Sequence, residues 1–354
     1  MSEGLFYFLA TFLKIFLTIN VLMLAVSLMT WVERRVSGVI QYRWGPNRVG
    51  PFGLLQPIAD GIKFVMKQDI MPADAHKPFY VLAPAFALVP AFVSFSAIPF
   101  GPEIEVFGRP VKLLIVDLDV GLLISFAAGS LGVYGIVLAG WSSRSKYSLM
   151  GGLRSTAQVI SYELPLLVSF AAVVLIAGTL RPYDIIEQQA GWFWNWNVFY
   201  GGWQIVGFLV FVISGFAETN RLPFDLPEAE AELVAGYHTE YSSMKFAMFF
   251  MAEYINMITM SAMAVTLFLG GYHLGFPAPE WLTGWPLWLL QVGAFATKVA
   301  LFQFVFVWVR WTLPRFRYDQ LMHLGWKRLI PLAFANLALT AVLAAFDVVG
   351  RTVK

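Results

Sequence analysis

Long apolar runs recur along the whole chain, and a polar segment separates each run from the next. A helix needs about 20 mostly apolar residues to cross a bilayer core of about 30 Å. Eight runs reach or approach that length, which predicts an all-α integral membrane protein with one membrane domain, residues 1–354. The predicted spans lie near residues 5–31, 78–99, 118–141, 159–180, 200–218, 246–271, 286–312 and 330–349.

The loops that follow odd-numbered spans hold most of the Lys and Arg residues outside the spans. Because basic residues concentrate in cytoplasmic loops, we predict that these loops face the inside of the cell. Both termini are then predicted on the outer, periplasmic side. The predicted inner loops are residues 32–77, 142–158, 219–245 and 313–329.

The first inner loop contains a helical pattern of its own. Within residues 53–70, Leu54, Ile58, Ile62 and Val65 recur at helical spacing among polar positions. This pattern predicts an amphipathic helix that lies in the membrane interface.

Two further segments between spans are patterned. Residues 219–245 are strongly acidic, and Asp225 followed by Pro227 and Glu228 is typical of a helix start. Residues 103–117, on the other side of the membrane, alternate in character around a Gly-Arg pair, which predicts a short hairpin.

Composition supports a chain embedded in lipid and limits its chemistry. Only 13% of its residues are charged, against about 25% in soluble proteins, and the mean hydropathy is +0.68. A net charge of +2 gives no basis for nucleic-acid binding. With no cysteine and four histidines, the chain lacks the ligands for iron–sulfur clusters or a thiolate metal site. Any redox centres are therefore expected on partner proteins.

Ionisable residues inside the spans carry the functional hypothesis, because each is costly in hydrocarbon and normally faces protein or water. Glu163 and Glu253 are predicted about 6–11 Å below the inner surface, from a rise of about 1.5 Å per residue. Glu33 and Glu218 lie at the inner ends of two other spans. Lys298, near the centre of the seventh span, needs a carboxylate or water nearby and is a candidate for an ion pair.

Some of these acids also have a purely structural interpretation. Glu33, followed by Arg34 and Arg35, is typical of a charged helix end. Three acids of the loop after the fifth span are equally typical of a solvated first helical turn: Glu228, Glu230 and Glu232.

Three long motifs resemble one known family. They read WVERRVSGVIQYRWGPNRVGPFGLLQPIADGIKF at 31–64, GWSSRSKYSLMGGLRSTAQVISYELP at 140–165 and AETNRLPFDLPEAEAELVAGYHTEYSSMKFAMFFMAEY at 217–254. These motifs resemble those of the quinone-site membrane subunit of respiratory complex I, the proton-pumping NADH:quinone oxidoreductase. They occur in the expected order, and the resemblance extends over essentially the whole chain.

The resemblance implies a subunit that borders a quinone access chamber and couples quinone reduction to proton translocation. Quinone would be the substrate, and FMN, iron–sulfur clusters and metals would lie on other subunits. Hydrophilic quinone-site and iron–sulfur subunits would dock on the inner loops, with antiporter-like and small membrane subunits alongside in the bilayer. The chain would be part of an enzyme, without a catalytic residue of its own. The length of its termini and loops favours a bacterial inner membrane over an organelle-encoded protein.

The same resemblance assigns residues to two groups. The quinone chamber would be bordered by Glu33, Arg34, Asp60, Lys63 and Phe64 and linked to the membrane by Arg221, Phe224 and Asp225. The proton-coupling chain would comprise Glu163, Glu218, Glu228, Glu230, Glu232 and Glu253.

Two alternatives remain open. A homologous subunit of a membrane-bound hydrogenase or ferredoxin-linked complex would share the acidic chain but need not handle quinone, and the intact segment 53–70 argues against it. A secondary transporter is disfavoured, because the chain has no evident internal repeat and its acids lie near the inner face rather than at the midplane.

Overall fold

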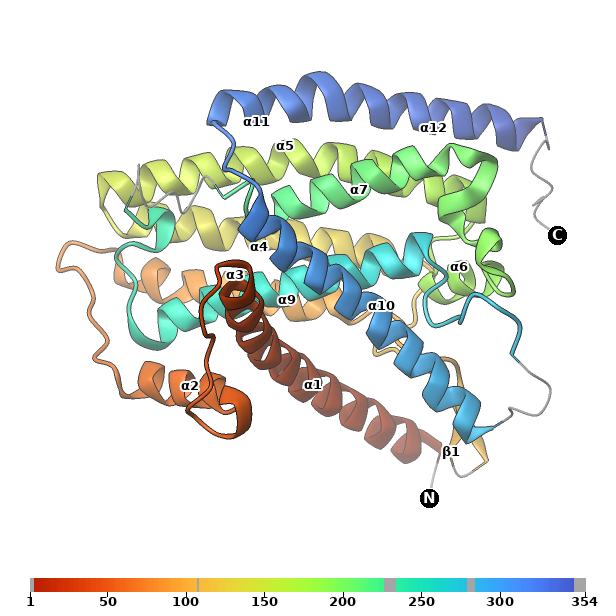
Figure 1. Cartoon of the computed structure of the whole chain (residues 1–354), viewed down its shortest axis with the longest axis horizontal. Coiled ribbons are helices and arrows are strands. Elements are labelled where there is room, and N and C mark those ends of the chain that lie inside the picture. The colour runs from red at the N-terminus through yellow and green to blue at the C-terminus, as the bar shows by residue number, and fades with distance from the viewer. Residues whose placement is uncertain (1–2, 107, 226–233, 279–283, 347–354) are drawn as a thin grey trace.

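The computed structural model describes residues 3–106, 108–225, 234–278 and 284–346. In these ranges nearly all regular structure is helical, and most helices run alongside one another while α1 and α10 cross the bundle obliquely (Figure 1). The predicted all-α class is confirmed.

Seven helical segments of the described chain are long and apolar enough to cross a membrane. They comprise α1 (Glu3–Ile40), α3 (Lys77–Phe95), α4 (Gly121–Ser142), α5 (Lys146–Ala177), α9 (Ser243–Phe268), α10 (Trp285–Thr312) and the run from α11 (Tyr318–Leu324) through η5 (Gly325–Leu329) to α12 (Ile330–Ala345). The predicted span 200–218 contains α7 (Gln204–Glu218), which is shorter but apolar. Each predicted span therefore contains a helix.

The other elements are short. They are η1 (Pro51–Gly53), α2 (Gln56–Met66), β1 (Ile104–Val106), β2 (Arg109–Val111), α6 (Pro182–Gln188), η2 (Phe193–Asn195), η3 (Asn197–Gly202) and η4 (Gly236–His238).

Several helices extend beyond the predicted spans into predicted inner loops. The 38-residue α1 continues to Ile40, and at about 1.5 Å per residue it is about 57 Å long. The predicted loop 142–158 is mostly helical, because α5 begins at Lys146. Hydropathy predicts which residues lie in lipid. It does not predict where a helix ends, because backbone hydrogen bonds continue the helix into the polar residues beyond.

The first residues of α1 and the last residues of α12 lie at the same end of the bundle, beside β1 and α6, and α2 lies at the opposite end (Figure 1). We call these the α6 end and the α2 end. At the α2 end, the His76 amide donates to the Ser142 carbonyl (3.0 Å), and at the α6 end the Leu122 amide donates to the Leu180 carbonyl (3.3 Å).

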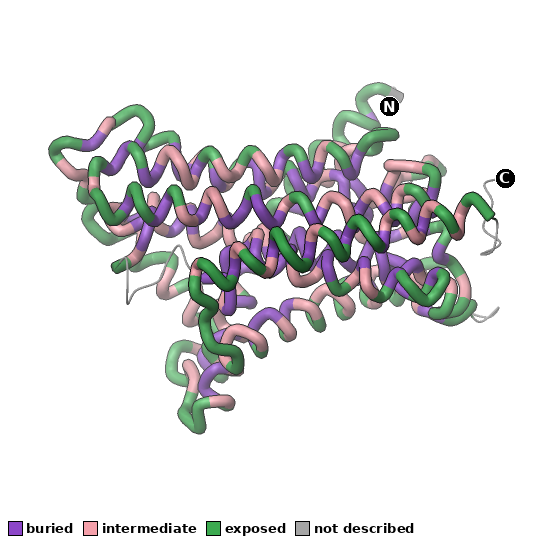
Figure 2. Tube along the Cα trace, turned by 90° about the horizontal axis from the view of Figure 1, so that it is seen from above, coloured by how far each residue is buried: buried purple, intermediate pink, exposed green. Residues whose placement is uncertain are grey.

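Close backbone contact holds the central helices together. A Cβ on Gly135 of α4 would lie 2.6 Å from the Ala87 nitrogen of α3, and one on Gly140 would lie 2.7 Å from the Ser148 carbonyl oxygen of α5. Small residues permit such approach between membrane helices. Figure 2 shows the buried residues running along the bundle interior and the exposed ones along its outer surfaces.

The predicted hairpin in residues 103–117 is confirmed, because β1 pairs with β2 in antiparallel register. Beyond it, Asp117 accepts hydrogen bonds from Arg181 (2.8 and 2.7 Å) and Lys112 (2.8 Å). The hydrogen bonds from Arg181 lower the pKa of Asp117 to about 2. A carboxyl group with a lowered pKa stabilises the folded state at every pH above the pKa that it has in the unfolded chain. This stabilisation is lost only as the pH falls through the lowered pKa of the folded state, so the Asp117 contacts are intact at neutral pH.

Candidate functional site

The predicted amphipathic helix exists as α2, and its apolar face is not covered by the rest of the described chain. No residue of α2 is buried. Ile58, Ile62 and Val65 are 59%, 59% and 66% exposed. An uncovered apolar face of this kind suits lipid, a hydrophobic ligand or a partner.

Polar contacts connect α2 to α1. Arg34 Nη1 lies 2.5 Å from Asp60 Oδ2, and Lys63 Nζ lies 3.7 Å from Asp60 Oδ1. Phe64 instead packs against α9, where its ring centroid lies 6.1 Å from that of Phe246. The structure thus brings together the predicted residues Arg34, Asp60 and Lys63, with Phe64 beside them on α2.

Glu33 is buried among three helices. It accepts hydrogen bonds from the Tyr254 hydroxyl of α9 and from Arg310 of α10, which also forms an ion pair with it. A carboxylate at low dielectric is tolerated when a cation and a second donor satisfy it. Sequence reasoning missed both partners, although Arg310 is a charged residue at the end of an apolar run.

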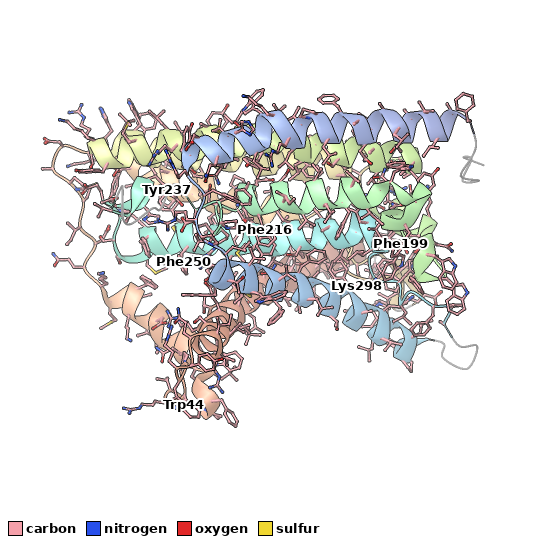
Figure 3. The ribbon with its side chains drawn as sticks, turned by 45° about the horizontal axis from the view of Figure 1, so that its top comes forward. Trp44, Phe199, Phe216, Tyr237, Phe250 and Lys298 are labelled. Carbon is pink, nitrogen blue, oxygen red and sulfur yellow. The ribbon has the colours of Figure 1, made fainter. Side chains whose placement is uncertain are left out.

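Arg221 contacts three residues of α9. Its side chain is 4% exposed, and its guanidinium lies 4.4 Å from the Tyr254 ring centroid and 5.7 Å from that of Phe250. Its Nη2 lies 3.4 Å from Glu253 Oε2, and Glu253 also accepts from the Tyr237 hydroxyl at 3.0 Å. Figure 3 shows Tyr237 and Phe250 toward the α2 end.

A polar cavity of about 40 Å³ continues from Glu253 into the bundle. Its lining includes Glu253, Tyr237, Asn220, Asn256 and Glu218. A site holds water when it offers at least about 10–15 Å³ and several polar partners. This cavity therefore has room for bound water between the carboxyl groups of Glu253 and Glu218.

Glu163, at the middle of α5, extends the series of acids beyond Glu218. Ser130 of α4 donates a hydrogen bond to Glu163, and a Cβ on the preceding residue, Gly129, would lie 3.6 Å from Glu218 Oε1. The two carboxyl groups are near enough to interact electrostatically. Two neighbouring carboxyl groups at low dielectric are costly to ionise together.

Gln158 fixes the start of the loop that carries Arg221. Its Nε2 donates to the Ala217 carbonyl (2.8 Å), to Asn220 Oδ1 (3.1 Å) and to the Phe224 carbonyl (2.7 Å). Phe224 itself is buried. Sequence reasoning did not single out Gln158, because an amide inside an apolar run carries no charge that would draw attention to it.

Asp225 is the last described residue before the gap at 226–233, and Arg315 donates to it at 3.1 Å. Three predicted coupling residues follow it and lie outside the described residues: Glu228, Glu230 and Glu232.

Lys298 has backbone partners in place of the expected carboxylate. Its ammonium donates to the carbonyls of Leu269 (2.7 Å), Gly271 (3.0 Å) and His273 (2.7 Å). It also lies 4.4 Å from the Trp196 ring centroid. These contacts anchor α10 to the residues that follow α9, which is a structural role.

Replacing Lys298 with methionine should destabilise the protein without acting on proton exchange. Three carbonyl groups would lose a donor, and each unsatisfied buried group costs about 1–3 kcal/mol. Thermal inactivation of the purified parent complex should occur at clearly lower temperature. Lys146→Met, at an exposed site, is the control, and equal inactivation temperatures for the two variants would contradict this role.

The site as a whole suits proton exchange and electrostatic response. It gathers carboxyl, guanidinium, phenol and amide groups around small cavities. In the parts of the chain that the structure covers, no three His, Asp or Glu side chains lie close enough to hold a metal ion.

Known proteins resemble this chain over almost its full length. The NADH dehydrogenase family matches residues 13–341. An H-type subunit of the NADH-quinone oxidoreductase of Koribacter versatilis is 51% identical, with 96% of this chain and 98% of that protein covered. The H-type subunit of the NADH-quinone oxidoreductase of Salinibacter ruber is 50% identical, with 96% of this chain and 98% of that protein covered. An H-type subunit from Solibacter usitatus is 48% identical, with 92% of this chain and 94% of that protein covered.

Proposed function

The chain belongs to the NADH dehydrogenase family, and from this premise we propose that it is the quinone-site membrane subunit of a proton-pumping NADH:quinone oxidoreductase. The resemblance of its three motifs to that family is confirmed. In this role the chain borders the quinone access chamber and transmits the effect of quinone reduction through a series of buried acids.

The connected path between the acids is the observation that carries the proposal. It starts at Glu33, passes through Tyr254 and Arg221 to Glu253, and crosses the polar cavity to Glu218. Because these groups are coupled, a change of charge at one end alters the protonation of the others. No redox centre on the chain is required for this response.

The α2 end supplies what a quinone chamber needs. An uncovered apolar face on α2 can take an isoprenoid tail, and charged groups stand beside it on α1 and α2. Electron transfer adds negative charge to the quinone head group until the head group takes up two protons to form the neutral quinol. Arg34 and Glu33 are consecutive residues on α1, with Arg34 in contact with α2 and Glu33 buried in the bundle. Through them, the added charge in the chamber would act electrostatically on the buried acids.

The proposed setting is a bacterial inner membrane, which the chain crosses several times with both termini on the periplasmic side. The α2 end then faces the cytoplasm. Hydrophilic quinone-site and iron–sulfur subunits would dock there, and antiporter-like and small membrane subunits would lie alongside in the bilayer. The relatives are themselves named as subunits of a larger oxidoreductase, which supports assembly with other chains.

A hydrogenase or ferredoxin-linked complex would use the same acids without the chamber. The α2 face and its Arg34–Asp60 contact favour the quinone-linked function. A secondary transporter that acts alone would not need an uncovered apolar face on α2.

Glu163→Gln in the native organism tests the function directly. The variant keeps the size of the side chain but cannot exchange a proton, so electron input to quinone and the proton gradient should both fall by about tenfold or more. Isolated membranes with assembled complex provide the measurement, and NADH should still reduce the upstream centres. Glu105→Gln, on the exposed hairpin, is the matched control. Normal turnover and gradient in Glu163→Gln would refute the relay.

A further inference from the structure

A second, smaller cavity lies directly beyond Glu218, on the side of the α6 end. Its volume is about 20 Å³, and Ser94, Ser125, Glu218 and Asn256 contribute to its lining. Ser94 is near the last residue of α3, and Ser125 is near the first residue of α4. Both of those positions are toward the α6 end, so the cavity lies on the α6 side of Glu218.

Three polar atoms at this cavity have no hydrogen-bond partner among the described residues: Ser94 Oγ, Ser125 Oγ and Glu218 Oε2. The two serines are only 2% and 1% exposed. Leaving a buried hydroxyl or carboxyl group unsatisfied costs about 1–3 kcal/mol. A bound water that accepts from the hydroxyls and donates to the carboxyl oxygen removes that cost.

We propose that Ser94, Ser125 and Glu218 bind an internal water that serves as a proton-exchange site on the α6 side of Glu218. The cavity is large enough for one water, which needs at least about 10–15 Å³, and it offers more than two polar partners. This inference rests on the proposed function, and it adds a site to the series of acids.

Glu218 and Asn256 line both cavities and so stand between them. Water on either side gives the Glu218 carboxyl group one proton partner toward Glu253 and another toward the serines. Phe126, Met260 and Met263 form apolar walls of the smaller cavity. The polar partners of the bound water in the smaller cavity are therefore Glu218 and the two serines, and this water exchanges protons with the Glu218 carboxyl group.

Hydroxyl-radical footprinting of the intact complex detects this water, because radicals form at bound water and oxidise adjacent methionines. Met260 and Met263 line the smaller cavity. Met257 lies on the same helix, is as buried as Met263 and lines neither of the two cavities, so it is the matched reference for Met263. Met260 and Met263 should be oxidised several-fold faster than Met257. Equal rates for the three methionines would overturn the proposal.

The double variant Ser94→Ala/Ser125→Ala removes two partners of the water and retains the fold. It should lower oxidation of Met263 to the rate of Met257 and slow proton pumping by about tenfold, as expected when a hydrogen bond to an ionisable group is lost. Ser214→Ala is the matched control, because Ser214 is buried and has no described partner but lies outside the cavity.

The outcomes separate this site from the function on which it rests. Normal pumping in the double serine variant, with Glu163→Gln still inactive, would overturn the water site and leave the proposed function standing. Normal pumping in Glu163→Gln would refute the relay itself, whatever the methionine oxidation shows.

Discussion

Replacing Arg221 with methionine should abolish coupled quinone reduction in complexes that still assemble. The guanidinium is the cation described beside Glu253, and it stacks over the Tyr254 ring. Removing one partner of a buried pair leaves a buried charge uncompensated, at a cost of about 3–5 kcal/mol. Glu253 would then hold its proton, and the path between Glu33 and the inner cavity would be interrupted. We expect activity to fall by at least about a hundredfold.

Two further substitutions show which property of Arg221 matters. Arg221→Lys keeps the charge but loses the planar group that stacks on an aromatic ring, so activity should be intermediate. Arg317→Met removes a cation whose partner is the exposed Asp319, and it should have little effect. NADH-driven quinone reduction and the proton gradient in isolated membranes measure all three. Full activity of Arg221→Met would remove Arg221 from the path.

The helices were predictable because their signal is local. Apolar runs of membrane length mark each of the long helices, and the helical spacing within 53–70 marks α2. The alternation within 103–117 likewise marks the hairpin. In each case the residues that form the element are neighbours in the sequence, so the element can be predicted without knowledge of the fold.

The partners of the acids were not predictable in this way. Arg310 meets Glu33 across 277 positions of sequence, and no local pattern relates the two. Gln158 is an uncharged residue that acts through a side-chain amide. Lys298 binds backbone carbonyls. Every residue has a backbone carbonyl, so residue type does not identify these partners in the sequence. Charge in lipid signals that a partner exists, but only the packing of helices identifies it.

The inner cavities follow from the same packing. A glycine at 129 brings α4 close to Glu218, and the serines at 94 and 125 face the same space from two helices. Serine in an apolar helix more often bonds to its own preceding turn, as Ser169 does to the Pro165 carbonyl. The sequence alone does not distinguish that arrangement from a hydroxyl that faces a cavity.

The pair of Glu33 and Arg310 should behave as one unit in a double-mutant cycle. Arg310→Gln leaves the buried Glu33 carboxylate with Tyr254 as its remaining described donor, and Glu33→Gln leaves the guanidinium uncompensated. Each single variant should therefore lose most of its quinone reductase activity. Its free energy of unfolding should fall by about 3–5 kcal/mol.

The double variant Glu33→Gln/Arg310→Gln replaces the ion pair with two neutral amides that can bond to each other and to Tyr254. Because no charge is then buried alone, its stability should recover toward that of the unmodified protein, while coupling stays impaired for lack of an ionisable group at Glu33. The more exposed pair Arg34–Asp60 is the control, since breaking a pair that water can reach should change stability by about 1 kcal/mol or less. Additive losses at Glu33 and Arg310, measured by thermal inactivation of the purified complex, would show that the two groups act independently.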